Sequence, residues 1–169
     1  MRHSLYTLAL AAAIATPAAA ELRVSFIEGA PKDRLLVQNL GLCDLQNLAI
    51  DLDFKDSEGR LIFDVTAKGA GVEVFQPLDV ARGASALIEE PTVSDGQTSL
   101  SLMVGSLAPK SEIVITADLD DQLGAREITV STSEFAGTVL SVKTPSLQMK
   151  EVFGPDPALT LALEPCDIS

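Results

Sequence analysis

The amino-acid sequence predicts an all-β protein, an antiparallel immunoglobulin-like β-sandwich in a single domain. Apolar and polar residues alternate over most of the chain, as they do in strands with one face in a core and one in water. Turn-forming residues separate these short segments, and no long stretch has the period of a helix. Many short strands at this spacing, with no internal repeat or linker, favour one sandwich.

The N-terminal segment, residues 1–20, is organised like a secretory signal peptide. A basic residue, Arg2, precedes the apolar stretch Leu5 to Ile14, and Ala18 to Ala20 supplies the small residues of a cleavage site. Cleavage after Ala20 would leave a domain of residues 21–169. We expect an exported protein, periplasmic or extracellular, because no later apolar stretch is long enough to span a bilayer. An uncleaved anchor helix is the less favoured alternative, since the apolar stretch is short.

The alternation places the strands by their apolar positions. The predicted strands contain Leu22/Val24/Phe26, a segment from Arg34 or Leu35 to Gln38, Leu48/Ile50/Leu52/Phe54, Leu61/Phe63/Val65, Val72/Val74, Leu100/Leu102/Val104, Ile113/Ile115/Ala117/Leu119, Ile128/Val130, Leu140/Val142, Leu147/Met149 and Leu159/Leu161/Leu163. Turns are predicted at Ser57-Glu58-Gly59, Gly69-Ala70-Gly71, Asp95-Gly96, Pro109-Lys110, Gly124 and Gly154-Pro155-Asp156-Pro157.

Two local motifs add detail to this pattern. The charged stretch FIEGAPKDR, from Phe26 to Arg34, could present its charges to a substrate or reverse the chain between two strands. Gly29 and Pro31 suit turn dihedral angles, so a connecting turn is favoured. Farther along, Ser131 to Glu134 has the spacing of a capping box, which predicts one helical turn between strands.

The residue inventory argues against most enzyme chemistries. The single His (His3) and the single Tyr (Tyr6) lie in the predicted leader, and the chain has no Trp. Nucleophilic triads, Cys–His dyads and His-ligated metal sites all require an imidazole. The chain also carries 24 acidic against 12 basic residues, which repels phosphate backbones and anionic membranes. We therefore expect no enzyme, no nucleic-acid partner and no membrane insertion of the mature chain.

The two cysteines, Cys43 and Cys166, lie near opposite ends of the predicted domain. In an oxidising compartment two such cysteines most often pair, so an intramolecular disulfide is predicted. A free or intermolecular thiol is the alternative.

Several segments resemble a known family. They are VSFIEGAPKDR, the stretch Asn39 to Cys43, LIFDVTAKGAGVEVFQP from Leu61 to Pro77, and DDQLGAREITVSTSEFAG from Asp120 to Gly137. They are similar to small secreted bacterial proteins called aggregation factor core, and the resemblance covers most of the mature chain. It implies an extracellular adhesive or associative role, and it supplies no catalytic residues.

The acidic residues suggest a calcium hypothesis. Asp51 and Asp53 share one face of a predicted strand, and Asp118 and Asp120 repeat the arrangement. If the two strands were neighbours, or their ends met with Asp121 in the following turn, carboxylate oxygens could converge on a hard divalent cation. The favoured alternative is a solvated acidic face that keeps the domain soluble. No cofactor is required by either interpretation.

Three function classes agree with these features to different degrees. The first is a secreted, non-catalytic interaction or adhesion module that binds protein or its own kind, with or without calcium. The second is a periplasmic chaperone or inhibitor that offers a strand edge to a client. The third, a hydrolase with two carboxylates, is least favoured because the aromatic surface on which sugars stack is missing. The first class is our expectation.

Overall fold

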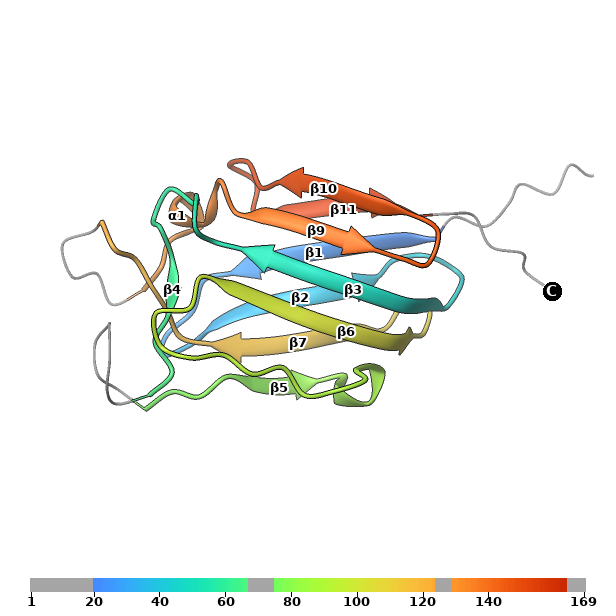
Figure 1. Cartoon of the computed structure of the whole chain (residues 1–169), viewed down its shortest axis with the longest axis horizontal. Coiled ribbons are helices and arrows are strands. Elements are labelled where there is room, and N and C mark those ends of the chain that lie inside the picture. Colours follow the sequence, from blue (N-terminus) through green and yellow to red (C-terminus); the bar gives the residue numbers. More distant parts are fainter. Residues whose placement is uncertain (1–19, 67–74, 124–128, 164–169) are drawn as a thin grey trace, which may run out of the picture.

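The computed structural model describes residues 20–66, 75–123 and 129–163, which form an antiparallel β-sandwich (Figure 1). A five-stranded sheet has the order β11-β1-β2-β7-β5, and a four-stranded sheet has the order β10-β9-β3-β6. A small two-stranded sheet, β4-β8, lies at one end of the sandwich. The predicted single-domain β-sandwich is confirmed, and its topology is compatible with immunoglobulin-like character.

The elements follow the predicted order with a few exceptions. The strands are β1 (Glu21–Ile27), β2 (Asp33–Asn39), β3 (Leu45–Asp53), β4 (Ile62–Phe63), β5 (Asp79–Arg82), β6 (Ser99–Leu107), β7 (Glu112–Ala117), β8 (Leu119–Asp120), β9 (Val139–Lys143), β10 (Gln148–Val152) and β11 (Ala158–Ala162). A 3-10 helix, η1 (Ala84–Ala86), and a short α-helix, α1 (Thr132–Phe135), complete the described part.

The core lies between the two large sheets. It consists of the apolar side chains that alternate with polar ones along each strand and point inward. In β1, Leu22 and Val24 are fully buried, and in β3, Ile50 and Leu52 face them from the other sheet. Each such side chain contributes about 1.5–3 kcal/mol when it leaves water. The outward residues of the same strands are more exposed, as at Asp51.

Five phenylalanines close the core at one end. Phe135 lies at their centre: its ring stacks on Phe26 with centroids 4.4 Å apart and meets Phe153 edge-on at 4.9 Å. The helix α1 carries Phe135, and the backbone N–H of Ser131 donates to Glu134 Oε2 at 2.7 Å as a capping box requires. The predicted helical turn is confirmed.

The connection between β1 and β2 is the predicted turn, and the last acidic residue of the FIEGAPKDR stretch is buried. Asp33 begins β2 and is only 3 % exposed, and its Oδ1 accepts a hydrogen bond from Gly29 N at 3.0 Å. The turn therefore closes on a buried carboxyl group rather than presenting that charge to solvent.

Three predicted strands need correction. The strand predicted through Leu119 ends at Ala117, because Asp118 interrupts the regular strand before β8 begins at Leu119. The strand predicted around Leu61 to Val65 is reduced to the two residues of β4, and side chains on both faces of this segment are buried. Val130 is buried but lies outside any strand.

Some predictions concern residues that the structure does not describe. Val72/Val74, Gly69-Ala70-Gly71, Gly124, Ile128 and Cys166 lie outside the described residues. Conversely, β5 is absent from the predicted strands, since its sequence DVAR offers a single large apolar residue and two charges.

Candidate functional site

The edges of the two sheets are the places where the fold exposes backbone hydrogen-bonding groups to another chain. The five-stranded sheet ends in β11 and β5, and the four-stranded sheet ends in β10 and β6. In Figure 1, β10 and β11 run along one long side of the molecule, and β5 and β6 run along the opposite side. Each edge has its own chemistry.

The edge of β6 is covered at its centre. Ile88 N donates to Met103 O at 2.8 Å, and Leu87 forms a β-bridge with Val104. The segment after η1 thus occupies backbone groups that another strand would use. The neighbouring edge strand β5 is short, and its pairing with β7 is irregular between Val80 and Arg82. This side of the sandwich is a poor template for strand addition.

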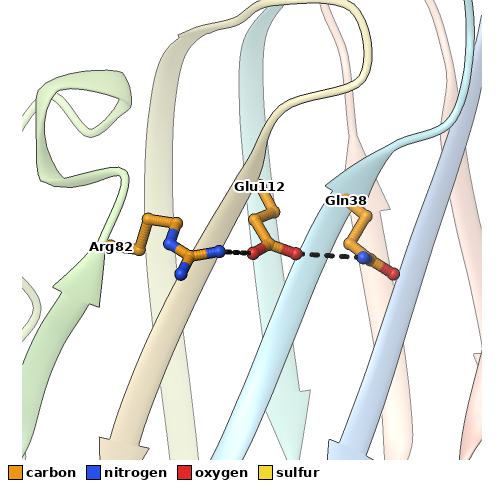
Figure 2. Close-up of polar contacts among 3 residues, drawn as sticks. All are labelled: Gln38, Arg82 and Glu112. Atoms are coloured by element: carbon orange, nitrogen blue, oxygen red, sulfur yellow. Dashed lines mark hydrogen bonds and ion pairs between the residues drawn. The ribbon is translucent and has the colours of Figure 1, made fainter.

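A polar ladder crosses the outer face of the five-stranded sheet next to β5 (Figure 2). Arg82 of β5 forms an ion pair with Glu112 of β7, and Gln38 Nε2 of β2 donates to the other carboxylate oxygen of Glu112 at 3.0 Å. The Arg82 side chain is 70 % exposed, so this ion pair adds only about 0.2–1 kcal/mol. Its structural effect is to place charges at the β5 edge.

The β10 edge is protected by charge. Lys150 and Glu151 lie in its middle, and Glu151 is paired in register with the fully buried Leu140. Side chains of directly opposed residues lie on the same face of a sheet, so Glu151 points toward the core side although it is exposed. An inward-pointing charge on an edge strand disfavours the addition of another strand.

The β11 edge has none of these protections. Its sequence, Ala158-Leu159-Thr160-Leu161-Ala162, contains no charge, Pro or Gly. Leu161 is buried and Leu159 packs against the core, while Thr160 and Ala162 are exposed on the outer face. Within the described residues, β11 pairs with β1 and with no other strand.

The hydrogen bonds that flank β11 show which of its backbone groups face outward. Pro157 O accepts from Phe26 N, and Leu163 N donates to Ala20 O, each at 2.8 Å. Since successive residues of a strand direct their backbone groups to opposite sides, every second residue from 157 to 163 bonds toward β1. Ala158, Thr160 and Ala162 therefore direct their N–H and C=O groups to the open edge.

A separate apolar groove lies at the end of the sandwich that carries β4. It has a volume of about 300 Å³, and Val65, Phe75, Pro77, Pro91 and Val93 contribute to its walls. Phe75 is 69 % exposed at this groove.

Polar contacts fix two of the groove walls. Asp95 accepts hydrogen bonds from the backbone amides of Val65 and Thr66 at 2.8 and 2.9 Å, and Lys32 Nζ donates to Pro77 O at 2.5 Å. The side-chain hydrogen bond from Thr66, together with the two amides, holds the pKa of Asp95 below its ordinary value.

Buried carboxyl groups gather behind the β1–β2 turn. Burial raises the pKa of Asp33 to about 7 despite the hydrogen bond from the amide of Gly29, and the charge of Asp118 raises it further. Burial is also the largest cause that raises the pKa of Asp118 to about 7, followed by repulsion from Asp120 and Asp64. Asp33 and Asp64 are 3 % and 1 % exposed, so neither can contact a substrate in this conformation.

The five residues of the calcium hypothesis are divided between the four-stranded sheet, which holds Asp51 and Asp53, and the region around β8, which holds Asp118, Asp120 and Asp121. Asp51 and Asp53 are on the outer face of β3, where Asp51 accepts from Ser101 Oγ and Asp53 from Lys55 N. Asp118 is buried between β7 and β8, Asp120 belongs to β8, and Asp121 accepts from Leu123 N. Strands β3 and β7 are not neighbours, and no group of three potential ligands occurs among the described residues. Calcium binding stays a prediction.

Cys43 lies in the connection between β2 and β3, where its carbonyl accepts a hydrogen bond from Asn39 Nδ2 at 2.7 Å. It is not a free cysteine. Because Cys166 lies outside the described residues, the bond between these two cysteines stays a prediction.

The sequence pattern predicts β11 as a strand but does not mark it as an edge. The available signal is a run of five uncharged residues in a chain whose residues are 21 % charged. No sequence feature indicates that the carboxyl group of Asp33 is buried, since the surrounding turn is rich in charged residues.

Comparisons with known proteins give no relative. No protein-family model, curated protein or solved structure matches the chain. In the part of the chain that the structure describes, no helix has the length and apolar character needed to cross a membrane.

Proposed function

We propose that this chain is an exported, non-catalytic interaction module that binds protein by strand addition to the open edge of β11. The observation that carries the proposal is the chemistry of that edge. Ala158, Thr160 and Ala162 direct their backbone groups outward from an uncharged strand that no other described segment covers. An extended partner segment gains main-chain hydrogen bonds at such an edge, and the residues on its two faces supply specificity.

Among the described residues, the carboxyl groups whose pKa values are raised are buried, which agrees with a binding role. The predicted mature chain contains no imidazole, and the carboxyl groups whose pKa values lie near 7 belong to Asp33 and Asp118, which are buried. A general acid or base must come within hydrogen-bond distance of its substrate. The resemblance to the aggregation factor core proteins favours the same adhesive or associative role.

The chaperone or inhibitor alternative would use the same edge with a different partner. A chaperone of this type would bind an unfolded client segment, so it would suppress the aggregation of a denatured protein at stoichiometric amounts. An adhesion module would bind a folded partner or another copy and leave that aggregation unchanged. A light-scattering assay with a reduced client separates the two roles.

A pair of substitutions at one residue tests the proposed edge. Thr160→Pro removes the outward N–H and leaves the bonds toward β1 in place, whereas Thr160→Val keeps the N–H and the β-branched shape. We expect Thr160→Pro, and also the charged edge variant Ala162→Lys, to lose partners that crosslink to the wild-type chain in the exported fraction of its own cells. Thr160→Val should retain them.

The outcome that contradicts the proposal is also defined by these variants. If circular dichroism shows that all variants are folded and the same partner crosslinks equally to each, the binding surface is not the β11 edge.

A thermal melt tests the calcium hypothesis, since a ligand held by the native state raises the melting temperature. Identical melts in calcium and in chelator would remove the calcium hypothesis.

A further inference from the structure

We propose that a second copy of this chain pairs with the β11 edge, antiparallel and about a two-fold axis at Thr160. This inference rests on the proposed function, because it uses the same edge and names its partner. The result is one continuous sheet that runs through both copies.

The backbone of β11 selects this register. In an antiparallel pair, directly opposed residues exchange hydrogen bonds only where both direct their backbone groups toward each other. With the axis at Thr160, Thr160 faces its own counterpart, and Ala158 faces Ala162 of the second copy. All three residues with outward groups are then used. An axis at Leu159 or Leu161 leaves the outward groups of one residue without a β11 partner.

The side chains fit the same register. On the core side, Leu159 lies opposite Leu161 of the second copy, so the two apolar layers continue across the axis. On the outer face, the small side chains of Ala158 and Ala162 meet, and Thr160 meets its counterpart. Such β-branched and apolar pairs favour strand association, and no like charges are opposed.

The β10 edge provides the contrast. A similar self-pairing about its central residue would place Lys150 opposite Lys150 and Glu151 opposite Met149. Like charges directly opposite one another destabilise a strand pair, so β10 does not favour its own copy. Strands β10 and β11 are the edge strands on the same long side of the molecule (Figure 1). Of these two, only β11 can pair with its own copy without opposing like charges.

The short contact sets the expected affinity. A pairing of five residues buries less than the roughly 1,200–2,000 Å² of a stable interface, so the dimer should be weak and reversible. Sedimentation velocity of the full chain, produced with its own leader, should show a monomer at low concentration and a dimer as the concentration rises. A chain that stays monomeric at every concentration overturns the inference.

Charge placement at two positions on the outer face, the half-buried Ala158 and the exposed Ala162, tests the register itself. The double variant Ala158→Lys/Ala162→Lys opposes like charges at both outer pairs, so dimerisation should weaken about tenfold. The double variant Ala158→Glu/Ala162→Lys opposes unlike charges at the same pairs, sets the lysine rather than the glutamate opposite Glu21 of β1, and should keep the dimer. Mixing the double-Lys variant with Ala158→Glu/Ala162→Glu should restore association as a mixed dimer.

The control pattern makes each failure interpretable. If both double variants dimerise as well as the wild type, the copies associate through another surface. If the wild type is monomeric but the Thr160→Pro variant loses a crosslinked partner, the second-copy inference fails and the proposed function stands. If the wild type does not dimerise and Thr160→Pro keeps every crosslinked partner, the proposed function fails as well.

Discussion

Asp33 shows how a single residue couples the fold to pH. Its carboxyl group lies behind the β1–β2 turn, where the backbone amide of Gly29 donates to it at 3.0 Å. The charges of Asp118 and Glu28 act on Asp33. The charges of Asp120, Asp64 and Lys32 act on Asp118, the second carboxyl group of this region. Because the charge of Asp118 repels an ionised Asp33, it adds to the burial that raises the free energy of ionising Asp33.

The first prediction is that the protein becomes less stable as the pH rises through this region. Asp33 has an ordinary pKa of 3.8 and a folded-state pKa of about 7, so between these values the native state binds the proton that the unfolded state has lost. The stabilisation that the protonated Asp33 gives the native state is fully present below pH 3.8 and is lost as the pH rises to about 7. The free energy of unfolding falls by at most about 1.4 kcal/mol per pH unit for one such group. Asp118 adds a change of the same sign.

Urea unfolding at about pH 5 and about pH 8 measures this dependence. Asn keeps an oxygen for the amide of Gly29 and carries no charge, so the Asp33→Asn variant should lose less stability between the two pH values than the wild type. The exposed Asp44→Asn substitution is the matched control and should behave like the wild type. An unchanged dependence in the Asp33 variant contradicts the assignment.

The second prediction compares two glycines with left-handed backbones. Gly137 has φ of 87°, and a Cβ there would lie 2.7 Å from the carbonyl oxygen of Asp56. Gly96 has φ of 77°, and a Cβ there would meet nothing within 4 Å. Alanine at position 96 should cost about 1–2 kcal/mol from the backbone alone. Gly137→Ala should cost clearly more, and equal midpoints in urea unfolding would argue against the close contact.

At the scale of elements, α1 depends on what it packs against. A helix of four residues is not stable alone, since nucleation is unfavourable. Phe135 secures it, because this side chain is fully buried among the rings of Phe26, Phe54 and Phe153.

The third prediction follows from this packing. Phe135→Ala should lower the free energy of unfolding by about 3–5 kcal/mol, because it opens a cavity where both sheets and α1 meet. Phe75→Ala removes the same atoms from a side chain that is 69 % exposed, so it should change stability by less than about 0.5 kcal/mol. Thermal or urea unfolding of the two variants checks the contrast.

The elements also show which parts of the fold are readable from sequence. Strands with one face in the core, such as β1, β3 and β6, are predicted correctly because burial and exposure alternate along them. The alternation fails where a segment is buried on both faces, as around β4, or where a charged edge strand lacks apolar residues, as in β5. The position of β11 at an edge was not predictable, since strand order arises from pairing between distant segments.

The same limit explains the acidic residues of the candidate site. Asp51 and Asp53 share the exposed face of β3 as predicted. Asp118 does not lie on an exposed strand face, because β7 ends at Ala117 and the Asp118 carboxyl group is buried, although Asp120 is close enough to raise its pKa. Side chains alternate between the two faces only while the strand continues. No local sequence feature indicates that this strand ends at Ala117.

For the whole molecule, both ends of the described domain meet at one end of the sandwich. Leu163 N, just after β11, donates to Ala20 O, and Leu40 N, just after β2, donates to Glu21 O. The connection that carries Cys43 leaves β2 at this same end (Figure 1). Cys166 lies three positions after Leu163, and an extended chain of that length spans at most about 10 Å.

The last prediction is a bond between Cys43 and Cys166 in an exported chain that begins at Glu21. In the chain-entropy account, closing so long a loop stabilises the native state by about 4–5 kcal/mol, because the unfolded chain loses conformational freedom. Reduction should therefore lower the urea midpoint of the wild type but leave the Cys43→Ser/Cys166→Ser variant unchanged. Intact mass with and without reductant gives both the first residue and the state of the thiols. Two free thiols in protein collected from an oxidising compartment would rule out the bond, and the contacts of Leu163 and Leu40 would then hold the two ends together without covalent help.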